Sequence, residues 1–281
     1  LAVLAAGLVS LRGNGIGIDR AHVARLNVDG LITENTKLTR AVEQLADDTS
    51  VKALIVRIDS PGGSVAGGES LHDAIAAVAA KKPVVAVMGG LAASAGYMIA
   101  VPAARIFAHE ATLTGSIGVL LEAPEFSGLL AKIGVDAQTI VSGPLKNQPS
   151  LTQPLSPQGH QVLQDLVMDM YGQFVAMVAA GRHMDPDKVR QLGDGRAYTG
   201  RQALQLGLVD AIGGEHDARL WLAQTKGVPA DLPVQDVSIS SFAERTLSGT
   251  LGPLFTGVWK TVVSQGVMLD GAWAVWHRSA D

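Results

Sequence analysis

The chain has 281 residues, of which 47% are hydrophobic and 17% charged, a balance typical of a globular protein rather than a disordered one. The net charge of −4 and the lack of any Lys/Arg-rich run argue against nucleic acid as a partner. The absence of cysteine excludes disulfides, thiolate metal sites and cysteine nucleophiles.

The first eleven residues, LAVLAAGLVSL, are apolar but shorter than the roughly 20 residues that a membrane-spanning helix needs. They begin at Leu1 without a methionine, so we expect a fragment or a processed form. Two interpretations of residues 1–21 stay open: the remnant of a membrane anchor with its polar linker RGNGIG, or a short buried element.

From residue 22 onward, β-rich runs alternate with amphipathic stretches. Such alternation predicts an α/β fold with largely parallel sheets packed by helices, because parallel strands need crossover connections. We expect one domain over residues 22–227, with a short helix starting at or just after Ser94 and a strand with a turn within 207–214. The other predicted strands span 23–28, 52–59, 83–90, 104–110, 116–121 and 136–141, and the other helices 36–48, 65–80, 157–181, 199–207 and 216–227.

Residues 228–281 form a tail that carries little charge but includes Phe255, Trp259, Trp273 and Trp276. A tail that packs on its own domain or on a neighbouring subunit is favoured over an interfacial membrane helix, because the basic face expected of such a helix is missing.

Two small-residue segments follow predicted strands. In DSPGGS (59–64), the paired glycines leave backbone N–H groups unobstructed, which suits a developing oxyanion, although such a pair is usually only a turn. In GGLAASAGY (89–97), small neighbours let a substrate carbonyl approach Ser94 at a strand-to-helix junction. In isolation, Ser94 is better interpreted as a helix N-cap.

A third segment, VSGPLKN (141–147), places Lys146 in an irregular stretch where a surface lysine is the default interpretation. A serine hydroxyl is a weak nucleophile and needs a base within hydrogen-bond reach. A lysine serves as that base only where burial disfavours its charged form. Spacing alone does not show that Ser94 and Lys146 meet.

Taken together, these segments resemble the signal peptide peptidase A family, serine peptidases with a Ser–Lys dyad. The resemblance runs from about residue 23 to residue 227 and implies a Clp protease/crotonase-like fold of repeated ββα spiral units. It rests on five segments in the family's order: SPGG, AASAGY, LTGSIGV, SGPLK and YTGRQALQLGLVDAIGG.

The resemblance implies a role for each matching residue. Ser94 is the nucleophile, Lys146 the base 52 residues downstream, and Ser116 the residue that orients the lysine. The oxyanion hole is formed by Gly63 and the N–H of Ala95, and the peptide binds as an extended strand beside Gly62, Gly63 and Ser64. One departure is Pro144-Leu145, where the family often has a basic and an aromatic residue.

The implied activity is the degradation of remnant signal peptides and other apolar peptides through an acyl-enzyme. No cofactor or metal is expected, since the seven histidines are scattered, without HExxH or metal-ligand spacing. By resemblance we further expect a homo-oligomeric ring of eight subunits in which neighbours complete one site. The expected location is the bacterial inner membrane, with the catalytic domain on the extracytoplasmic side.

The sequence also bears on four alternatives. A Clp-type Ser–His–Asp triad is disfavoured because His109 lies only 15 residues after Ser94 and no histidine occurs in 110–159. A crotonase-type acyl-CoA enzyme would need acidic catalytic residues that have no clear counterpart. A phage-type capsid maturation protease would share the same chemistry. A non-hydrolytic peptide-binding homologue would not need the Ser94, Ser116 and Lys146 set.

Overall fold

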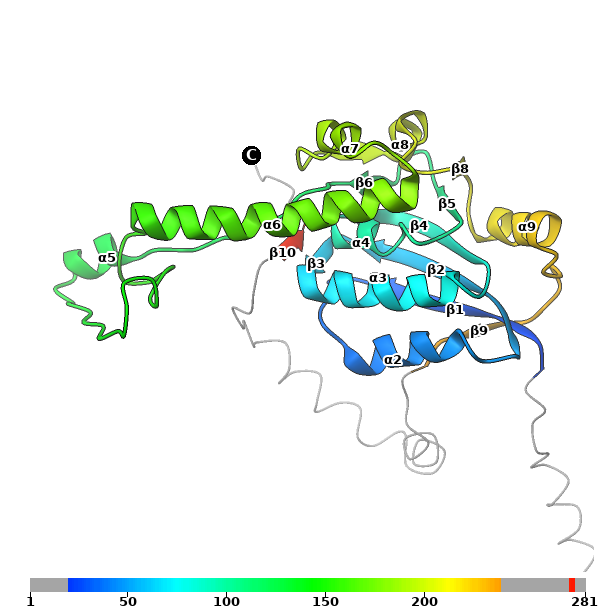
Figure 1. Cartoon of the computed structure of the whole chain (residues 1–281), viewed down its shortest axis with the longest axis horizontal. Helices are drawn as coiled ribbons and strands as arrows, with labels where there is room; N and C mark the ends of the chain where they lie inside the picture. The colour runs from blue at the N-terminus through cyan, green and yellow to red at the C-terminus, as the bar shows by residue number, and fades with distance from the viewer. Residues whose placement is uncertain (1–19, 239–272, 276–281) are drawn as a thin grey trace, which may run out of the picture.

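The computed structural model describes residues 20–238 and the backbone of residues 273–275. The centre of the molecule is an eight-stranded sheet (Figure 1) in which β7-β6-β4-β2-β1-β9 are successive neighbours, while β5 pairs with β4 and β8. The strands are β1 (His22–Asp29), β2 (Val51–Ser60), β4 (Val84–Ala93), β5 (Arg105–Ala108), β6 (Leu113–Gly115), β7 (Ala197–Thr199), β8 (Ala211–Ile212) and β9 (Val234–Asp236). All pairs are parallel except β6–β7, so the expected α/β class with largely parallel strands is confirmed.

Two further strands form a separate antiparallel pair, and helices pack around the sheet. The pair consists of β3 (Gly62–Ser64) and β10 (Trp273–Val275). The helices are α2 (Thr36–Leu45), α3 (Val65–Ala79), α4 (Ala95–Met98), α5 (Ser127–Lys132), α6 (Pro157–Arg182), α7 (Pro186–Leu192), α8 (Gly200–Leu206) and α9 (Glu215–Lys226). Two of them begin with side-chain caps: Ser156 caps α6 ahead of Pro157, and α8 starts with a capping box of Thr199 and Gln202.

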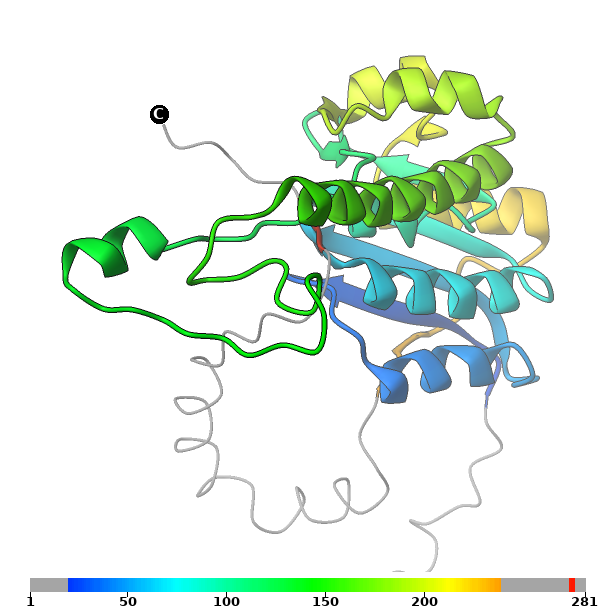
Figure 2. The ribbon, with the colours of Figure 1, turned by 60° about the vertical axis from the view of Figure 1, so that its left-hand side comes forward.

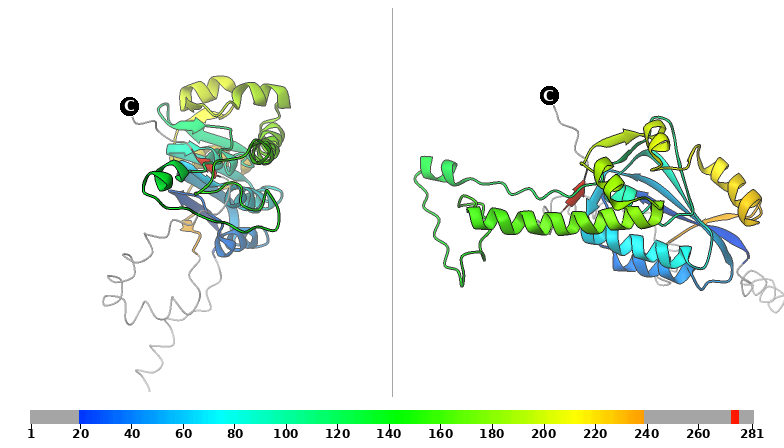
Figure 3. Two further views of the ribbon diagram at one scale, coloured as in Figure 1. Left: turned by 90° about the vertical axis from the view of Figure 1, so that its left-hand side faces the viewer. Right: turned by 45° about the horizontal axis from the view of Figure 1, so that its top comes forward.

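The sheet is buried on both faces, which explains the continuous apolar run in β2. Leu54, Val56 and Ile58 belong to a large core shared with α2, α3, α4 and α6, whereas Ala53 and Ile55 belong to a smaller core shared with α9. Figure 3 shows α9 apart from the α2 and α3 pair. Alternate side chains of one strand therefore serve opposite cores, as is usual where helices cover both faces of a sheet.

Two predicted strands are wrong. Residues 116–121 leave the sheet, because Gly115 (φ 78°) and Ser116 (φ 49°) turn the chain out of the ladder just after β6. Residues 136–141 also form no strand. They run through solvent without a neighbouring strand, and Ile140 there is fully exposed, so nothing can satisfy a ladder of backbone groups.

A long arm, residues 119–168, projects beyond the sheet (Figures 1 and 2). It comprises α5, the segment between α5 and α6, and the first half of α6, whereas the second half of α6 is anchored in the core by Phe174, Val175 and Val178. The arm exposes large apolar side chains, including Leu129, Ile133, Ile140, Val162, Leu166 and Met168. Such a surface is typical of an interaction site.

The expected boundary between the domain (22–227) and the tail (228–281) lies within the described residues. Strand β9 lies in the expected tail yet pairs with β1 in the main sheet. Residues 1–19 of the expected anchor remnant and linker (1–21) lie outside the described residues, as does the Trp259 region of the tail. Within the described residues, no helix combines the length and apolarity needed to cross a bilayer.

Buried polar contacts hold α4 and α6 in place. The Tyr97 hydroxyl, whose pKa is raised by complete burial, donates a hydrogen bond to the Leu208 carbonyl at 2.8 Å. Arg182 at the end of α6 forms a bidentate pair with Asp210 (Nη2–Oδ1 2.6 Å, Nη1–Oδ2 3.0 Å) and also donates to the Gly207 carbonyl. Both helices are therefore bonded to the same segment, residues 207–210, which precedes β8.

We expect Asp210→Ala to lower the free energy of unfolding by about 2–3 kcal/mol, because it leaves the buried Arg182 guanidinium without its counter-charge. Urea unfolding followed by circular dichroism measures the change. Asp47→Ala, which removes the partner of Lys81 in an exposed ion pair, is the matched control and should leave the midpoint unchanged. Equal losses in the two variants would contradict the anchoring role of Asp210.

Candidate active site

Ser94 lies at the junction between β4 and α4 in a strained backbone conformation. Its φ of 56° and ψ of −120° are rare for a residue with a side chain and cost about 1–3 kcal/mol. The conformation is held because the Ser94 N–H donates to the Gly115 carbonyl at 2.8 Å, while its carbonyl accepts from Tyr97 and Met98. Strain of this kind is typical of a serine presented for reaction.

The side chain of Ser94 is fully buried, and its Oγ has no hydrogen-bond partner among the described residues. Ser94 is the N-cap residue of α4 by position, but its hydroxyl does not cap the helix. A buried hydroxyl left unpaired costs stability, so its presence points to a functional use.

The small residues around Ser94 are required by close packing. A Cβ on Gly96 would lie 2.9 Å from the Ser60 carbonyl oxygen, and a Cβ on Gly68 would lie 2.9 Å from the Cβ of Ala95. The start of α4 is therefore pressed against the end of β2 on one side and against α3 on the other. This packing explains the run of small residues that the sequence shows after Ser94.

Residues Gly62, Gly63 and Ser64 form β3 beside α4. Gly62 has φ 111°, a conformation that favours glycine, and a Cβ on Gly63 would lie only 1.8 Å from the Ile32 carbonyl oxygen. The Ser64 side chain caps α3 by accepting from the Gly67 N–H at 3.2 Å. The Ser64 hydroxyl is therefore already used as a helix cap.

The structure brings Ser116 next to Ser94. Ala93 and Gly115 are partners in the parallel β4–β6 ladder, so Ser94 and Ser116 leave the sheet at the same level. Ser116 is buried, with φ 49°, and its N–H donates to the Arg196 carbonyl at 3.0 Å. Gly63, Ala95 and Ser116 thus all lie around the β4–α4 junction.

Lys146 is not placed beside Ser94. It is exposed and lies in the arm, in the segment between α5 and α6, where its N–H donates to the Gly143 carbonyl. Figure 1 shows this segment extending away from β4 and α4. The described chain therefore holds the proposed nucleophile and the proposed base in separate parts of the molecule.

No histidine takes the place of the lysine, because Ser94 Oγ has no partner among the described residues. His109, the histidine of the triad alternative, is exposed and borders Gly200 and Gly214 instead. Within residues 20–238, no group of three His, Asp or Glu side chains could hold a metal ion.

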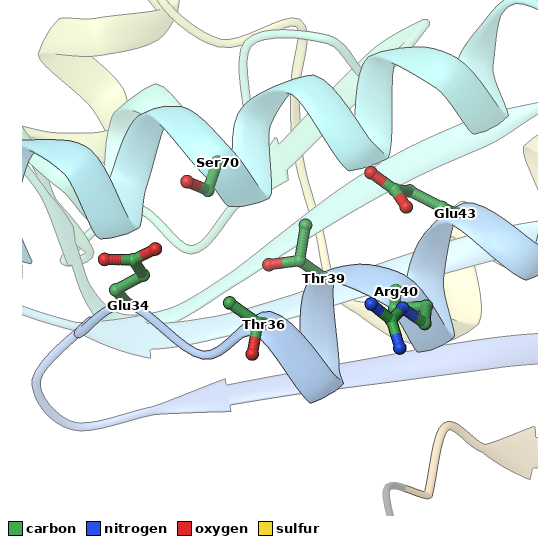
Figure 4. Close-up of a pocket in the computed structure, with 6 residues that line it drawn as sticks. All are labelled: Glu34, Thr36, Thr39, Arg40, Glu43 and Ser70. Carbon is green, nitrogen blue, oxygen red and sulfur yellow. The ribbon is translucent and has the colours of Figure 1, made fainter.

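A surface pocket lies elsewhere, between α2 and α3 (Figure 4). None of the predicted site residues lines it; the lining residues are Glu34, Thr36, Thr39, Arg40, Glu43 and Ser70.

Two features near the site were not predicted. Asp59, at the end of β2, accepts a hydrogen bond from the Leu91 N–H at 3.1 Å and so supports the irregular end of β4. Strand β10 pairs with β3, with Ala274 opposite Gly63. The position of Asp59 at the start of DSPGGS could have indicated a role near the site. No local sequence pattern indicates which strand residues 273–275 pair with.

Comparison with known proteins places the chain in a family. The sequence profile of peptidase family S49 matches residues 76–229, and that of Clp protease matches residues 31–113. A Synechocystis sp. protein assigned as a protease is 42% identical over 213 residues, which cover 75% of this chain and 77% of the relative. The chloroplastic serine protease SPPA of Arabidopsis thaliana is 32% identical over 236 residues, covering 84% of this chain but 34% of the relative.

Other relatives are also longer than the matched region. Protease 4 of Salmonella typhi is 41% identical over 172 residues, which cover 61% of this chain and 28% of the relative. Among solved structures, an alanine variant of the 1510-N membrane-bound stomatin-specific protease aligns with a TM-score of 0.51 at 16% identity and covers 79% of this chain and 99% of that one. At this identity the likeness concerns the fold, and with the Clp protease match it confirms the expected Clp protease-like class.

We expect Gly63→Ala to lower the free energy of unfolding by at least about 2 kcal/mol, because the added Cβ would overlap the Ile32 carbonyl. Gly172→Ala is the matched control. Gly172 lies within α6 with open space around its Cβ position, so this variant should gain up to about 1 kcal/mol from helix propensity. Urea denaturation of both variants measures the difference, and a neutral Gly63→Ala would contradict the close approach of β3 to Ile32.

Proposed function

Because the chain belongs to peptidase family S49 and is a serine peptidase, we propose that it cuts peptides with Ser94 as nucleophile and Lys146 as general base. The observation that carries the proposal is the state of Ser94. Its hydroxyl is buried, unpaired within the described chain and held on a strained turn between a strand and a helix. This combination costs stability, and a reactive serine gives it a function.

We place the base on a neighbouring copy of the chain. Lys146 lies in the projecting arm, and the arm exposes Leu129, Ile133 and Ile140. An apolar arm of this kind favours burial against a second copy, and closed rings are a common outcome of such head-to-tail contacts. In this arrangement the arm of one subunit delivers Lys146 to Ser94 of the next.

The proposed reaction is acyl transfer. The neutral Nζ of Lys146 takes the proton from Ser94 Oγ, which attacks the carbonyl carbon of the scissile peptide bond. The N–H groups of Gly63 and Ala95 stabilise the oxyanion, and Ser116 orients the lysine. Lys146 then protonates the leaving amine, and a water molecule hydrolyses the acyl-enzyme to release the acid and regenerate Ser94.

The proposed substrates are remnant signal peptides and other apolar peptides, bound as an extended strand beside Gly62, Gly63 and Ser64. An Enterococcus faecium relative, assigned as a signal peptide peptidase SppA, is 35% identical and supports this substrate class; the alignment covers 72% of this chain and 63% of that protein. We further propose an octameric ring at the outer face of the bacterial inner membrane.

Activity on fluorogenic apolar peptides tests the dyad. We expect Ser94→Ala and Lys146→Ala each to lower kcat at least about 1,000-fold, because either change removes a step of acyl transfer. Lys132→Ala, which changes another exposed lysine of the arm, should retain full activity. Retention of near-normal turnover by Ser94→Ala or Lys146→Ala would disprove the dyad.

Mixing the two inactive variants tests whether the site is shared between subunits. If Ser94 and Lys146 come from different chains, a random equal mixture pairs an intact serine with an intact lysine at about a quarter of the sites. We therefore expect about a quarter of the normal rate after the subunits are dissociated and reassembled together. A mixture as inactive as its parts would show that both residues act within one chain.

A further inference from the structure

Strand β4 changes its neighbour part-way along one edge. Its residues 85–87 pair with β5, whereas its residues 91–93 pair with β6. Both pairings are parallel, and β6 follows β5 directly in the chain. The short stretch 88–90 therefore joins two parts of β4 that belong to different neighbours, and the second part leads directly into Ser94.

The same stretch contains a β-bulge on the edge toward β2. Ile58 of β2 is level with Met88 of β4. Two residues later in β2, Ser60 is level with Ala92. Four steps along β4 thus match two steps along β2, so two residues of β4 have no partner on β2. Because this surplus is an even number, the side chains before and after the bulge keep the same faces, and Met88 and Ala92 share one core.

The bulge sets the position of Ser94 along the sheet. At about 3.3 Å per residue, the two surplus residues hold Ser94 roughly 7 Å further back toward the end of β2 than an unbroken ladder would. This register brings Gly96 against the Ser60 carbonyl, the contact that seats α4. Bulges next to active sites commonly direct a side chain in this way.

Two side chains bind the bulge, one from each side. From β2, the carboxylate of Asp59 accepts from the Leu91 N–H at 3.1 Å, and a Cβ on Gly89 would lie only 3.2 Å from the Asp59 Cγ. From the turn between β5 and β6, the hydroxyl of the buried Thr112 donates to the Gly89 carbonyl at 2.6 Å and accepts from the His109 N–H at 2.9 Å. Side chains thus supply hydrogen-bond partners at a point where the regular ladder is interrupted.

From this arrangement we propose that Asp59 and Thr112 are positioning residues of the peptidase: their side chains clamp the bulge and so fix where Ser94 lies relative to the peptide-binding strand β3. The inference rests on the proposed function, in which Ser94 is the nucleophile. It adds two residues that act on the reaction through the backbone of β4 rather than by contact with the reacting atoms.

The clamp holds Ser94 but does not hold β3. Strand β3 is fixed by Ile32 on one edge and by the Ser60 hydroxyl, which accepts from the first N–H of β3 at 3.1 Å. The contact of Asp59 toward β1 comes from its backbone, because its carbonyl accepts from the Gly30 N–H at 2.9 Å. Removal of the Asp59 side chain should therefore shift Ser94 without disturbing the peptide-binding strand, which predicts a lower kcat at an unchanged KM.

Paired substitutions at Asp59 test the proposal through rescue by the conservative variant. Asp59→Ala removes the acceptor of the Leu91 N–H, whereas Asp59→Asn keeps one carbonyl oxygen there. We expect Asp59→Ala to lower the kcat for fluorogenic apolar peptides at least about 10-fold with KM changed less than about two-fold, and Asp59→Asn to retain at least about half of the kcat. Asp29→Ala is the matched control and should leave both constants unchanged, because Asp29 is level with Asp59 but lies on β1, which does not border β4.

A second pair of variants keeps the test independent of whether Asp59→Ala folds. Thr112→Val removes both hydrogen bonds of the hydroxyl, and Thr112→Ser keeps them. The kcat should fall at least about 10-fold in Thr112→Val and less than about three-fold in Thr112→Ser. Urea unfolding identifies the chains that are folded under the assay conditions. The inference is overturned if neither conservative variant exceeds its folded partner in kcat, or if the loss appears in KM instead.

Labelling of Ser94 separates this inference from the proposed function. A fluorophosphonate transfers its phosphonyl group to the serine oxygen with release of fluoride, and mass spectrometry of the full chain measures the rate. The rate should fall in Asp59→Ala and Thr112→Val and return in the conservative variants. If no chain cleaves peptides but the labelling rates differ in this way, the proposed function fails while the clamp stands. If peptides are cleaved and all variants react at the same rate, the inference fails alone, and an unreactive Ser94 in the unchanged chain would overturn both.

Discussion

The backbone of Ser94, held at φ 56° between β4 and α4, is the constraint on which the site depends. The hydrogen bond from its N–H to the Gly115 carbonyl joins it to β6, and the tight contact of Gly96 with Ser60 joins it to β2. These contacts come from β2 and β6, the two strands that pair with β4. The fold therefore stabilises a conformation that Ser94 would not adopt in an isolated peptide.

The same packing prepares β3 for an extended ligand. Gly63 must be glycine, because any side chain would collide with Ile32, and the contact with Ile32 uses one edge of the strand completely. The other edge pairs with β10. A strand edge that can hold an extended segment beside a strained serine is a suitable arrangement for a peptide-cutting site, because the backbone of any peptide can bind there.

The described chain is divided into a body built on the sheet and a projecting arm. The body contains Ser94, Ser116 and Gly63, whereas Lys146 lies in the arm, whose apolar residues have no core of their own. This division means that assembly and catalysis are coupled in the proposed function. A chain whose base arrives only with its neighbour is inactive until it assembles, which protects other proteins from an unassembled peptidase.

The sequence by itself determined the α/β class, most of the elements and the identity of the segments around Ser94, because periodicity and glycine placement are local properties. It did not determine the irregular path after Gly115, the solvent path of residues 136–141 or the separation of Lys146 from Ser94. It also gave no indication that residues 273–275 pair with β3. These features depend on contacts between residues distant in the chain, and only the tertiary structure decides which strand edges and which side chains meet.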